Sequence, residues 1–413
     1  MLATVPVPEK HLVDYVESAG AEAVERLREA ARPLQGARLL QLNSTGFGGG
    51  VAELLFTQVA LFNDLGIETT WAVLEGSDDY FAVTKAVHNA LQGAAVEWTP
   101  QMASTYWDRI VANAAQLVDG YDFYLVHDPQ PAAILKVIEE EGRRGGRWLW
   151  RCHIDLSTPH LPVWEFFEPI VNRYDAAIFT MQDFAQPGVQ GPTLAFIPPS
   201  IDPLSVKNRA LSEETTHEVL AAYGIDPARP IISQVSRFDP WKDPLGVIDA
   251  YRLLKDGLPE LQLIMAGSLA HDDPEGMRYL DLTEEHRAGD PDIHLLTNLQ
   301  GVGDLQISAF QEASKVIVQK STREGFGLVV TEGMWKQKPV VGGNVGGIRL
   351  QIVDGETGFL VDSVESCADR IGELLRDPEL RGRMGRNGHE RVRERFLSLR
   401  EVEDYLRVMT AVT

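Results

Sequence analysis

Apolar runs and amphipathic stretches alternate along the first half of the chain. A helical segment is predicted over 21–34, and the runs after it have the length and β-rich content of strands. These runs lie at 37–44, 68–76, 123–128, 147–155, 176–180 and 193–200. Short strands separated by helical segments are typical of parallel sheets built from βαβ units, so the pattern predicts an α/β domain.

The segment 198–214 interrupts this rhythm with prolines and polar residues, which is typical of a linker. A second series of strand-like runs follows at 230–238, 261–268, 293–299, 314–322, 338–347 and 357–363, and a charged helical segment ends the chain. The pattern predicts two Rossmann-like, doubly wound parallel-sheet domains, over 1–205 and 206–390. A helical tail over 391–413 is expected to pack back on the N-terminal domain.

Length and charge narrow the classes of function. The chain has 413 residues, 44% of them hydrophobic, which is enough for two cores. Its 60 acidic and 38 basic residues give a net charge of −22, which argues against a nucleic-acid partner. Cys152 and Cys367 lie far apart and are expected to be incidental thiols, although one disulfide is arithmetically possible. We expect no signal peptide, no membrane span and a cytoplasmic location, and leave a homodimer open.

A glycine-rich loop, "LNSTGFGGGVAELL" at 42–55, joins the first strand to a helix-like segment. Gly49 and Gly50 would let N–H groups at the helix N-terminus approach an anion such as phosphate. No lysine completes a P-loop here, and Val51 breaks a dinucleotide fingerprint that would begin at Gly46. A tight strand-to-helix turn with no ligand remains the alternative.

Two cations follow a strand of the second series. Arg237 and Lys242, in "SRFDPWKDP", are placed at the carboxyl end of that strand, where open α/β sheets bind ligands. In so acidic a chain, paired cations at this place favour stabilisation of a diphosphate leaving group. The alternative is a solvated surface loop.

Two glutamates frame a second glycine loop, "STREGFGLVVTEG". Glu324 lies in the loop and Glu332 in the helix that follows it. Carboxylates accept hydrogen bonds from the vicinal hydroxyls of a sugar. The N–H groups of Phe326, Gly327 and Leu328 open this helix and would suit a phosphate.

Taken together, these motifs resemble the retaining glycosyltransferases of the GT-B architecture, two Rossmann-like domains that face each other across a donor cleft. Within that architecture, "HIDLSTP", "PPSIDPLSVKN", "SRFDPWKDPLGVIDAYR" and "AHDDPEG" resemble the trehalose glycosyltransferring synthases. The resemblance implies reversible transfer of glucose from a nucleoside diphosphate glucose to free glucose, giving α,α-trehalose. The base of the nucleotide (ADP, UDP or GDP) is not readable from the residues.

The resemblance also implies roles for particular residues. The catalytic group is Arg237, Lys242, Glu324 and His153. The donor-binding group is Gly49, Gly50, Phe326, Gly327, Leu328, Glu332, Asn298 and Leu299, with Glu332 on the ribose. The acceptor-binding group is His127, Asp128 and Asp155. No protein nucleophile is implied, since the departing diphosphate can take the acceptor's proton.

Several of these residues have a plainer explanation. His153 could be an ordinary histidine at a strand end, and Asp155 a turn cap. The run His271, Asp272 and Asp273 matches no metal-ligand spacing and is expected to form a turn. We therefore expect no metal site and no tightly bound cofactor, although free Mg²⁺ could stimulate the reaction.

Rival functions remain at this point. A dinucleotide-dependent oxidoreductase is disfavoured by Val51 and leaves the two glutamates unexplained. A non-catalytic sugar-nucleotide binding protein would use the same fold. Within the enzymes, the alternatives are a trehalose phosphorylase and a sucrose- or trehalose-phosphate-type synthase.

Overall fold

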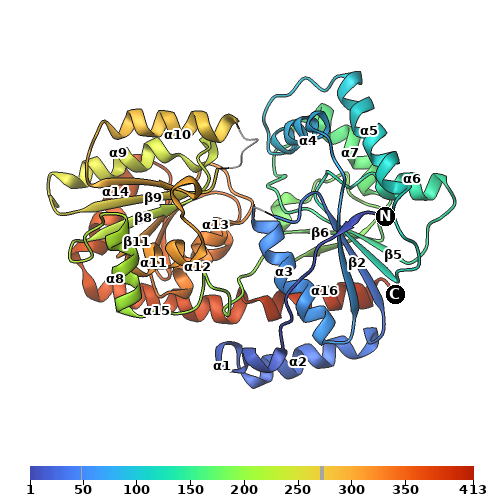
Figure 1. Ribbon diagram of the computed structural model, residues 1–413, viewed down its shortest axis with the longest axis horizontal. Coiled ribbons are helices and arrows are strands. Elements are labelled where there is room, and N and C mark those ends of the chain that lie inside the picture. Colours follow the sequence, from blue (N-terminus) through green and yellow to red (C-terminus); the bar gives the residue numbers. More distant parts are fainter. Residues whose placement is uncertain (48, 270–273) are drawn as a thin grey trace. The chain divides into compact units, whose positions relative to one another are not determined.

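Two compact units make up the protein (Figure 1). The computed structural model describes residues 1–47, 49–269 and 274–413. Unit 1 consists of Met1–Ser200 and Ser398–Thr413, and unit 2 of Ile201–Leu397. The chain thus enters unit 2 slightly before the boundary expected at 205. The C-terminal helical segment of unit 1 begins at Ser398, whereas the helical tail was expected to begin at 391.

Unit 1 contains a seven-stranded sheet in the order β1-β3-β2-β4-β5-β6-β7. Its strands are β1 (Ala3–Thr4), β2 (Arg38–Asn43), β3 (Glu68–Val73), β4 (Phe123–His127), β5 (Arg147–Arg151), β6 (Ala176–Phe179) and β7 (Thr193–Phe196). All neighbours pair in parallel except β1, which pairs antiparallel with β3. The sequence pattern did not predict β1, because two residues carry no periodicity.

The helices of unit 1 connect these strands, and the last one returns from the far end of the chain. The α-helices are α1 (Val16–Ala19), α2 (Ala21–Ala31), α3 (Gly49–Asp64), α4 (Asp78–Leu91), α5 (Pro100–Ala114), α6 (Ile134–Glu140), α7 (Leu161–Val171) and α16 (Ser398–Ala411). The 3-10 helices are η1 (Leu12–Tyr15), η2 (Arg32–Leu34) and η3 (Gln182–Phe184). Helix α16 packs against α2 and α3.

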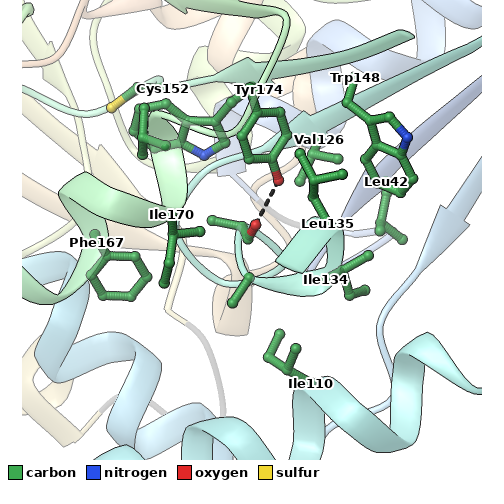
Figure 2. Packing of buried hydrophobic residues seen from close by; sticks show 14 of the residues in the cluster. Leu42, Ile110, Val126, Ile134, Leu135, Trp148, Cys152, Phe167, Ile170 and Tyr174 are labelled. Carbon is green, nitrogen blue, oxygen red and sulfur yellow. Dashed lines mark hydrogen bonds between the residues drawn. The ribbon is translucent and has the colours of Figure 1, made fainter. Parts of the chain in front are cut away.

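One face of this sheet carries the main core of unit 1. Side chains that alternate along β4 and β5, such as Val126 and Trp148, point to helices α5, α6 and α7 (Figure 2). The hydroxyl of Tyr174 donates to the carbonyl of Ala132, 2.6 Å away, and so satisfies its one polar atom within this core. The intervening residues of the same strands point to the opposite face, and this alternation places the candidate site residue His127 there, together with Arg151.

Unit 2 contains a six-stranded, wholly parallel sheet in the order β10-β9-β8-β11-β12-β13. Its strands are β8 (Ile231–Val235), β9 (Gln262–Gly267), β10 (Ile293–Thr297), β11 (Val316–Gln319), β12 (Val340–Gly343) and β13 (Gly358–Val361). Every run that the sequence analysis assigned to a strand, in both units, contains one. This confirms the α/β class and the two doubly wound sheets.

Helices cover both faces of the second sheet. The α-helices are α8 (Glu213–Ala222), α9 (Pro244–Lys255), α10 (Pro274–Arg287), α11 (Asp304–Ala313), α12 (Leu328–Trp335), α13 (Ile348–Gln351), α14 (Val364–Arg376) and α15 (Pro378–Arg395); the 3-10 helices are η4 (Pro240–Lys242) and η5 (Asn298–Gln300). Side chains of α9 and α14 share one core cluster with the sheet, and those of α8 and α11 share another. Within the described part of the chain, no helix is both long and apolar enough to cross a bilayer.

Candidate active site

The glycine loop of unit 1 leads from β2 into α3. Gly49 is the first residue of α3 and has a φ of 80°, a left-handed conformation that favours glycine. Gly49 and Gly50 are both exposed. Before them, Asn43 fixes the loop, because its amide donates to the carbonyl of Thr45 at 2.8 Å and its oxygen accepts from Trp71. The loop thus presents an exposed helix N-terminus, which suits an anion.

Two histidines at the ends of β4 and β5 form a hydrogen-bonded chain with a glutamine from β2. Nδ1 of His127 lies 2.9 Å from Nε2 of His153, and Nε2 of His127 lies 3.0 Å from Oε1 of Gln41. Burial, together with the charge of Arg151, lowers the pKa of His127 to about 3 and holds that of His153 well below its usual value. Both rings are therefore neutral at neutral pH.

With both rings neutral, the amide oxygen of Gln41 at Nε2 of His127 decides which nitrogen carries each proton. Nε2 of His127 donates to Gln41, so its Nδ1 accepts from Nε2–H of His153. This leaves Nδ1 of His153 as an acceptor, and that buried atom has no partner among the described residues. His153 is therefore the member of the pair that can accept a hydrogen bond from the hydroxyl of a sugar. Both nitrogens of His127 already have partners, and one of them holds His153 in place. Direct contact of His127 with the acceptor sugar stays a prediction.

Asp128 sits directly after β4 in an unusual backbone conformation. Its φ is 64°, and a non-glycine residue held there is often part of a functional site. Oδ1 of Asp128 accepts from the backbone N–H of His153 at 2.8 Å. Burial raises the pKa of Asp128 to about 6, against the opposing effects of this hydrogen bond and of Arg151. Asp128 can therefore exchange a proton near neutral pH.

The remaining acceptor candidate, Asp155, has partners within its own turn. Its Oδ1 accepts from the backbone N–H of Ser157 at 3.0 Å and from the Ser157 hydroxyl at 2.6 Å. These are the contacts of a turn cap, the plainer explanation that the sequence left open. Its role on an acceptor stays a prediction.

Unit 2 brings the second cation and the first glutamate together. Nζ of Lys242 lies 2.5 Å from Oε2 of Glu324, and the two side chains are only 14% and 10% exposed. The same oxygen accepts from Ser321 at 3.2 Å and from Gln319 at 3.4 Å. We call Lys242, Glu324, Ser321 and Gln319 the Glu324 cluster. Oε1 of Glu324 has no hydrogen-bond partner among the described residues, so it can accept a hydrogen bond from a hydroxyl.

Arg237, the first cation of the pair, lies at the surface. Its side chain is 55% exposed and its Nη2 lies 3.0 Å from Oδ2 of Asp239. Asp239 also caps η4, because its carboxylate accepts from the backbone N–H of Lys242 at 3.1 Å. Arg237 and Lys242 are thus held by one short loop, as their spacing suggested, but only Lys242 enters the Glu324 cluster.

The second glycine loop packs tightly against the loop after β12. Gly327 has a φ of 84° and precedes α12, whose first residue is Leu328, while Phe326 is buried. A Cβ on Gly347 would overlap the backbone of residues 325 and 326. The N–H of Gly347 donates to the carbonyl of Glu324 at 3.1 Å. The sequence analysis did not single out Gly347, although the run "GGNVGG" after a strand was a usable signal.

Glu332 is buried, with both carboxylate oxygens engaged. Its Oε2 accepts from Gln311 at 2.7 Å, and its Oε1 lies 3.3 Å from Nζ of Lys207. Only 1% of its side chain is exposed. Binding of a ribose by Glu332 stays a prediction, and it requires the hydroxyls to share or replace the contact with Lys207.

The residues proposed to flank the base lie in η5, after β10. The side chain of Asn298 closes on the backbone of Leu269, accepting at 2.8 Å and donating at 3.0 Å, so its backbone is the part left for a ligand. Leu299 is 61% exposed. The run His271, Asp272 and Asp273, expected to form a turn, lies outside the described residues.

Comparisons with known proteins show the family to which the chain belongs. Residues 41–186 match the family described as trehalose synthase, N-terminal domain, and residues 216–391 match the glycosyl transferases group 1. The trehalose synthase of Rubrobacter xylanophilus is 48% identical over 411 residues, covering 99% of this chain and 98% of that protein. The chain belongs to the trehalose synthase family.

A second relative supports the family assignment, and a solved structure supports the fold. The trehalose synthase of Thermococcus litoralis is 46% identical over 404 residues, covering 97% of each protein. A solved α,α-trehalose-phosphate synthase (UDP-forming) from Burkholderia xenovorans, in complex with glucose 6-phosphate, superimposes with a TM-score of 0.76. It covers 91% of this chain and 100% of its own at 15% identity, so it shows the fold alone. The present chain therefore has the GT-B fold, and its family makes it a glycosyltransferase.

Each unit, taken by itself, offers groups that can bind part of a sugar nucleotide or a sugar. Unit 2 supplies cations and a carboxylate with a free oxygen, a combination that can hold a diphosphate and a sugar hydroxyl. Unit 1 supplies a neutral imidazole acceptor and a carboxyl group with a raised pKa, which can hold uncharged hydroxyls. The sequence analysis missed Gln41, Gln319 and Arg151, which support these groups. Polar residues inside apolar strand runs were the signal for them.

Proposed function

We propose that this glycosyltransferase transfers glucose from a nucleoside diphosphate glucose to free glucose, with retention of configuration, and so forms α,α-trehalose reversibly. The trehalose synthase relatives support the product, and the residues support the donor. The observation that carries the proposal is the Glu324 cluster, in which a cation and a carboxylate share one hydrogen-bonded network at the ends of β8 and β11.

The proposed reaction needs no nucleophile from the protein. The bond between the sugar C1 and the diphosphate oxygen breaks, and the acceptor hydroxyl oxygen forms the new bond to C1. The proton of that hydroxyl passes to the departing diphosphate. Arg237 and Lys242 would stabilise the negative charge that grows on the leaving group, which is the kind of interaction that lowers a barrier.

The other residues would hold the substrates. We propose that Glu324 accepts from a hydroxyl of the transferred glucose and Glu332 from the ribose. His153 and Asp128 would bind sugar hydroxyls, with His127 orienting His153. Fixed orientation of both reactants is itself a large part of catalysis of this type. Because protein cations can serve the diphosphate, we expect activity to persist in EDTA, with Mg²⁺ at most stimulating it.

A product analysis tests the proposal. The purified protein is incubated with ADP-, UDP- or GDP-glucose and offered glucose, glucose 6-phosphate or phosphate in turn. We expect a non-reducing disaccharide with glucose alone, and proton NMR should show α anomeric couplings on both sugars. A product only with glucose 6-phosphate would indicate a synthase that forms a disaccharide phosphate. A β linkage at the transferred glucose would exclude retention. Binding of the nucleotide sugar without any product would indicate a sugar-nucleotide binding protein.

A further inference from the structure

An ion pair between a buried lysine and a half-buried aspartate lies beside the Glu324 cluster and has no place in the reaction described above. Nζ of Lys320, directly after β11, pairs with Oδ2 of Asp243, the residue before α9. Lys320 is 8% exposed. A buried ammonium group is costly unless it is paired, so this contact fixes the position of both residues.

Asp243 has an unusual backbone for its residue type. Its φ of 47° and ψ of 54° are left-handed, which costs a non-glycine residue free energy unless its surroundings hold it there. Two contacts of the carboxylate hold Asp243 in this conformation. Oδ1 accepts from the N–H of Gly246 at 3.2 Å, and Oδ2 pairs with Lys320. A Cβ on Gly246 would occupy the place of this carboxylate.

This conformation decides the position of the preceding residue. Lys242 is joined directly to Asp243, and its carbonyl accepts from Gln234 of β8 at 2.8 Å. The carbonyl of Trp241 accepts from the N–H of Thr322 at 2.8 Å, so the loop is tied to the segment after β11. Lys320 and Thr322 flank Ser321, a member of the Glu324 cluster.

We propose that Lys320 is a positioning residue for glucosyl transfer: through Asp243 it clamps the loop that carries Lys242 onto the end of β11 and so aims the Lys242 ammonium at Glu324. The ion pair acts on the reaction only through the placement of Lys242. This inference rests on the proposed role of Lys242 in the donor site. It also makes a statement about the loop that can be measured without any substrate.

The test uses three variants and one control in the full-length protein. Lys320→Met removes the ammonium group, and Asp243→Asn removes the charge while keeping a residue that tolerates the left-handed conformation and can cap α9. The double variant measures their coupling. Lys315→Met, an exposed lysine just before the same strand, is the matched control.

We expect each single variant to lower kcat by about 10- to 100-fold with a smaller change in donor KM. A misplaced Lys242 stabilises less of the negative charge that develops on the diphosphate in the transition state. The double variant should be no worse than the poorer single one, because both break the same pair. Hydrogen exchange at the Thr322 amide should be faster in both single variants. Lys315→Met should match the parent in every measurement.

Gly246→Ala reaches the same carboxylate without removing a charge. Its methyl group would displace the Asp243 carboxylate, so kcat should fall and exchange at Thr322 should become faster, as in Asp243→Asn. The proposal is overturned if Asp243→Asn keeps both the parent kcat and the parent exchange at Thr322. If the parent transfers no glucose while the exchange changes appear, the proposed function fails and the clamp stands.

Discussion

Lys242 and Glu324 form a buried ion pair of 2.5 Å between the loop after β8 and the loop after β11. The sequence analysis gave these residues different partners, the diphosphate and the transferred glucose. In the folded protein they are also partners of each other. Because Ser321 and Gln319 donate to the same oxygen of Glu324, the carboxylate is held in one orientation before any ligand arrives.

The pairing predicts that the two side chains act as one unit in catalysis. Lys242→Met and Glu324→Gln should each lower kcat by about 10²–10³, the usual loss when one group that stabilises developing charge is removed. The double variant should lose little more than the poorer single one, since groups that act together are not additive. Steady-state kinetics measures the cycle, and circular dichroism checks folding. Additive losses would show that the two residues act separately.

Arg237→Ala should reduce turnover far more than it reduces stability. Its guanidinium is 55% exposed and makes one ion pair, with Asp239, whose side chain is 6% exposed. If it stabilises the leaving diphosphate, kcat should fall by about 10²–10³. Arg370→Ala is the control, because Arg370 is also exposed and paired with one carboxylate, Glu373. Parent-like turnover in Arg237→Ala would place the diphosphate elsewhere.

Glu332→Gln should raise the donor KM more than it lowers kcat. Contacts with ribose exist before and during the reaction, so their loss falls on binding. The variant also breaks the pair with Lys207 and should cost about 3 kcal/mol of unfolding free energy. Lys207→Met separates the two effects, because it breaks the same pair and keeps the carboxylate. An equal rise of KM in both variants would indicate general damage to the loop.

Asp128 should make the fold less stable as the pH rises. Its pKa of about 6 in the fold lies above its ordinary value of 3.8, so the unfolded chain releases this proton more readily. The contribution is present below the ordinary pKa and is lost as the pH passes through the folded pKa. Relative to Asp128→Asn, the parent should lose about 2 kcal/mol of unfolding free energy between about pH 4 and pH 7.

Urea unfolding of both proteins at a series of pH values measures this difference. Asparagine tolerates the left-handed backbone of Asp128, so the substitution changes the charge and little else. Asp108→Asn, at an exposed position of α5, should show no such trend against the parent. A difference that does not vary with pH would show that Asp128 is not held in a poorly solvated place.

Apolar patterning by itself determined the fold class and the place of nearly every strand. Each run of apolar residues between polar helical faces became a strand of a parallel sheet, because such runs can be buried on both faces. The sequence order of strands and motifs also predicted that Arg237 and Glu324 would follow strands of one sheet. Among the strands of the described residues, only β1 was not predicted, because it is too short to show a pattern.

What only the tertiary structure decided is which polar groups meet. Gln41 supports His127, Gln234 holds the carbonyl of Lys242, and Gln319 donates to Glu324. Each of these glutamines lies inside an apolar strand run, where the sequence shows an irregular polar position and no partner. A buried amide must find a hydrogen bond. The partner of Gln41 lies 86 residues away on a neighbouring strand, whereas the partners of Gln234 and Gln319 lie in the segments that follow their own strands. In each case the path of the folded chain decided which polar group meets the amide.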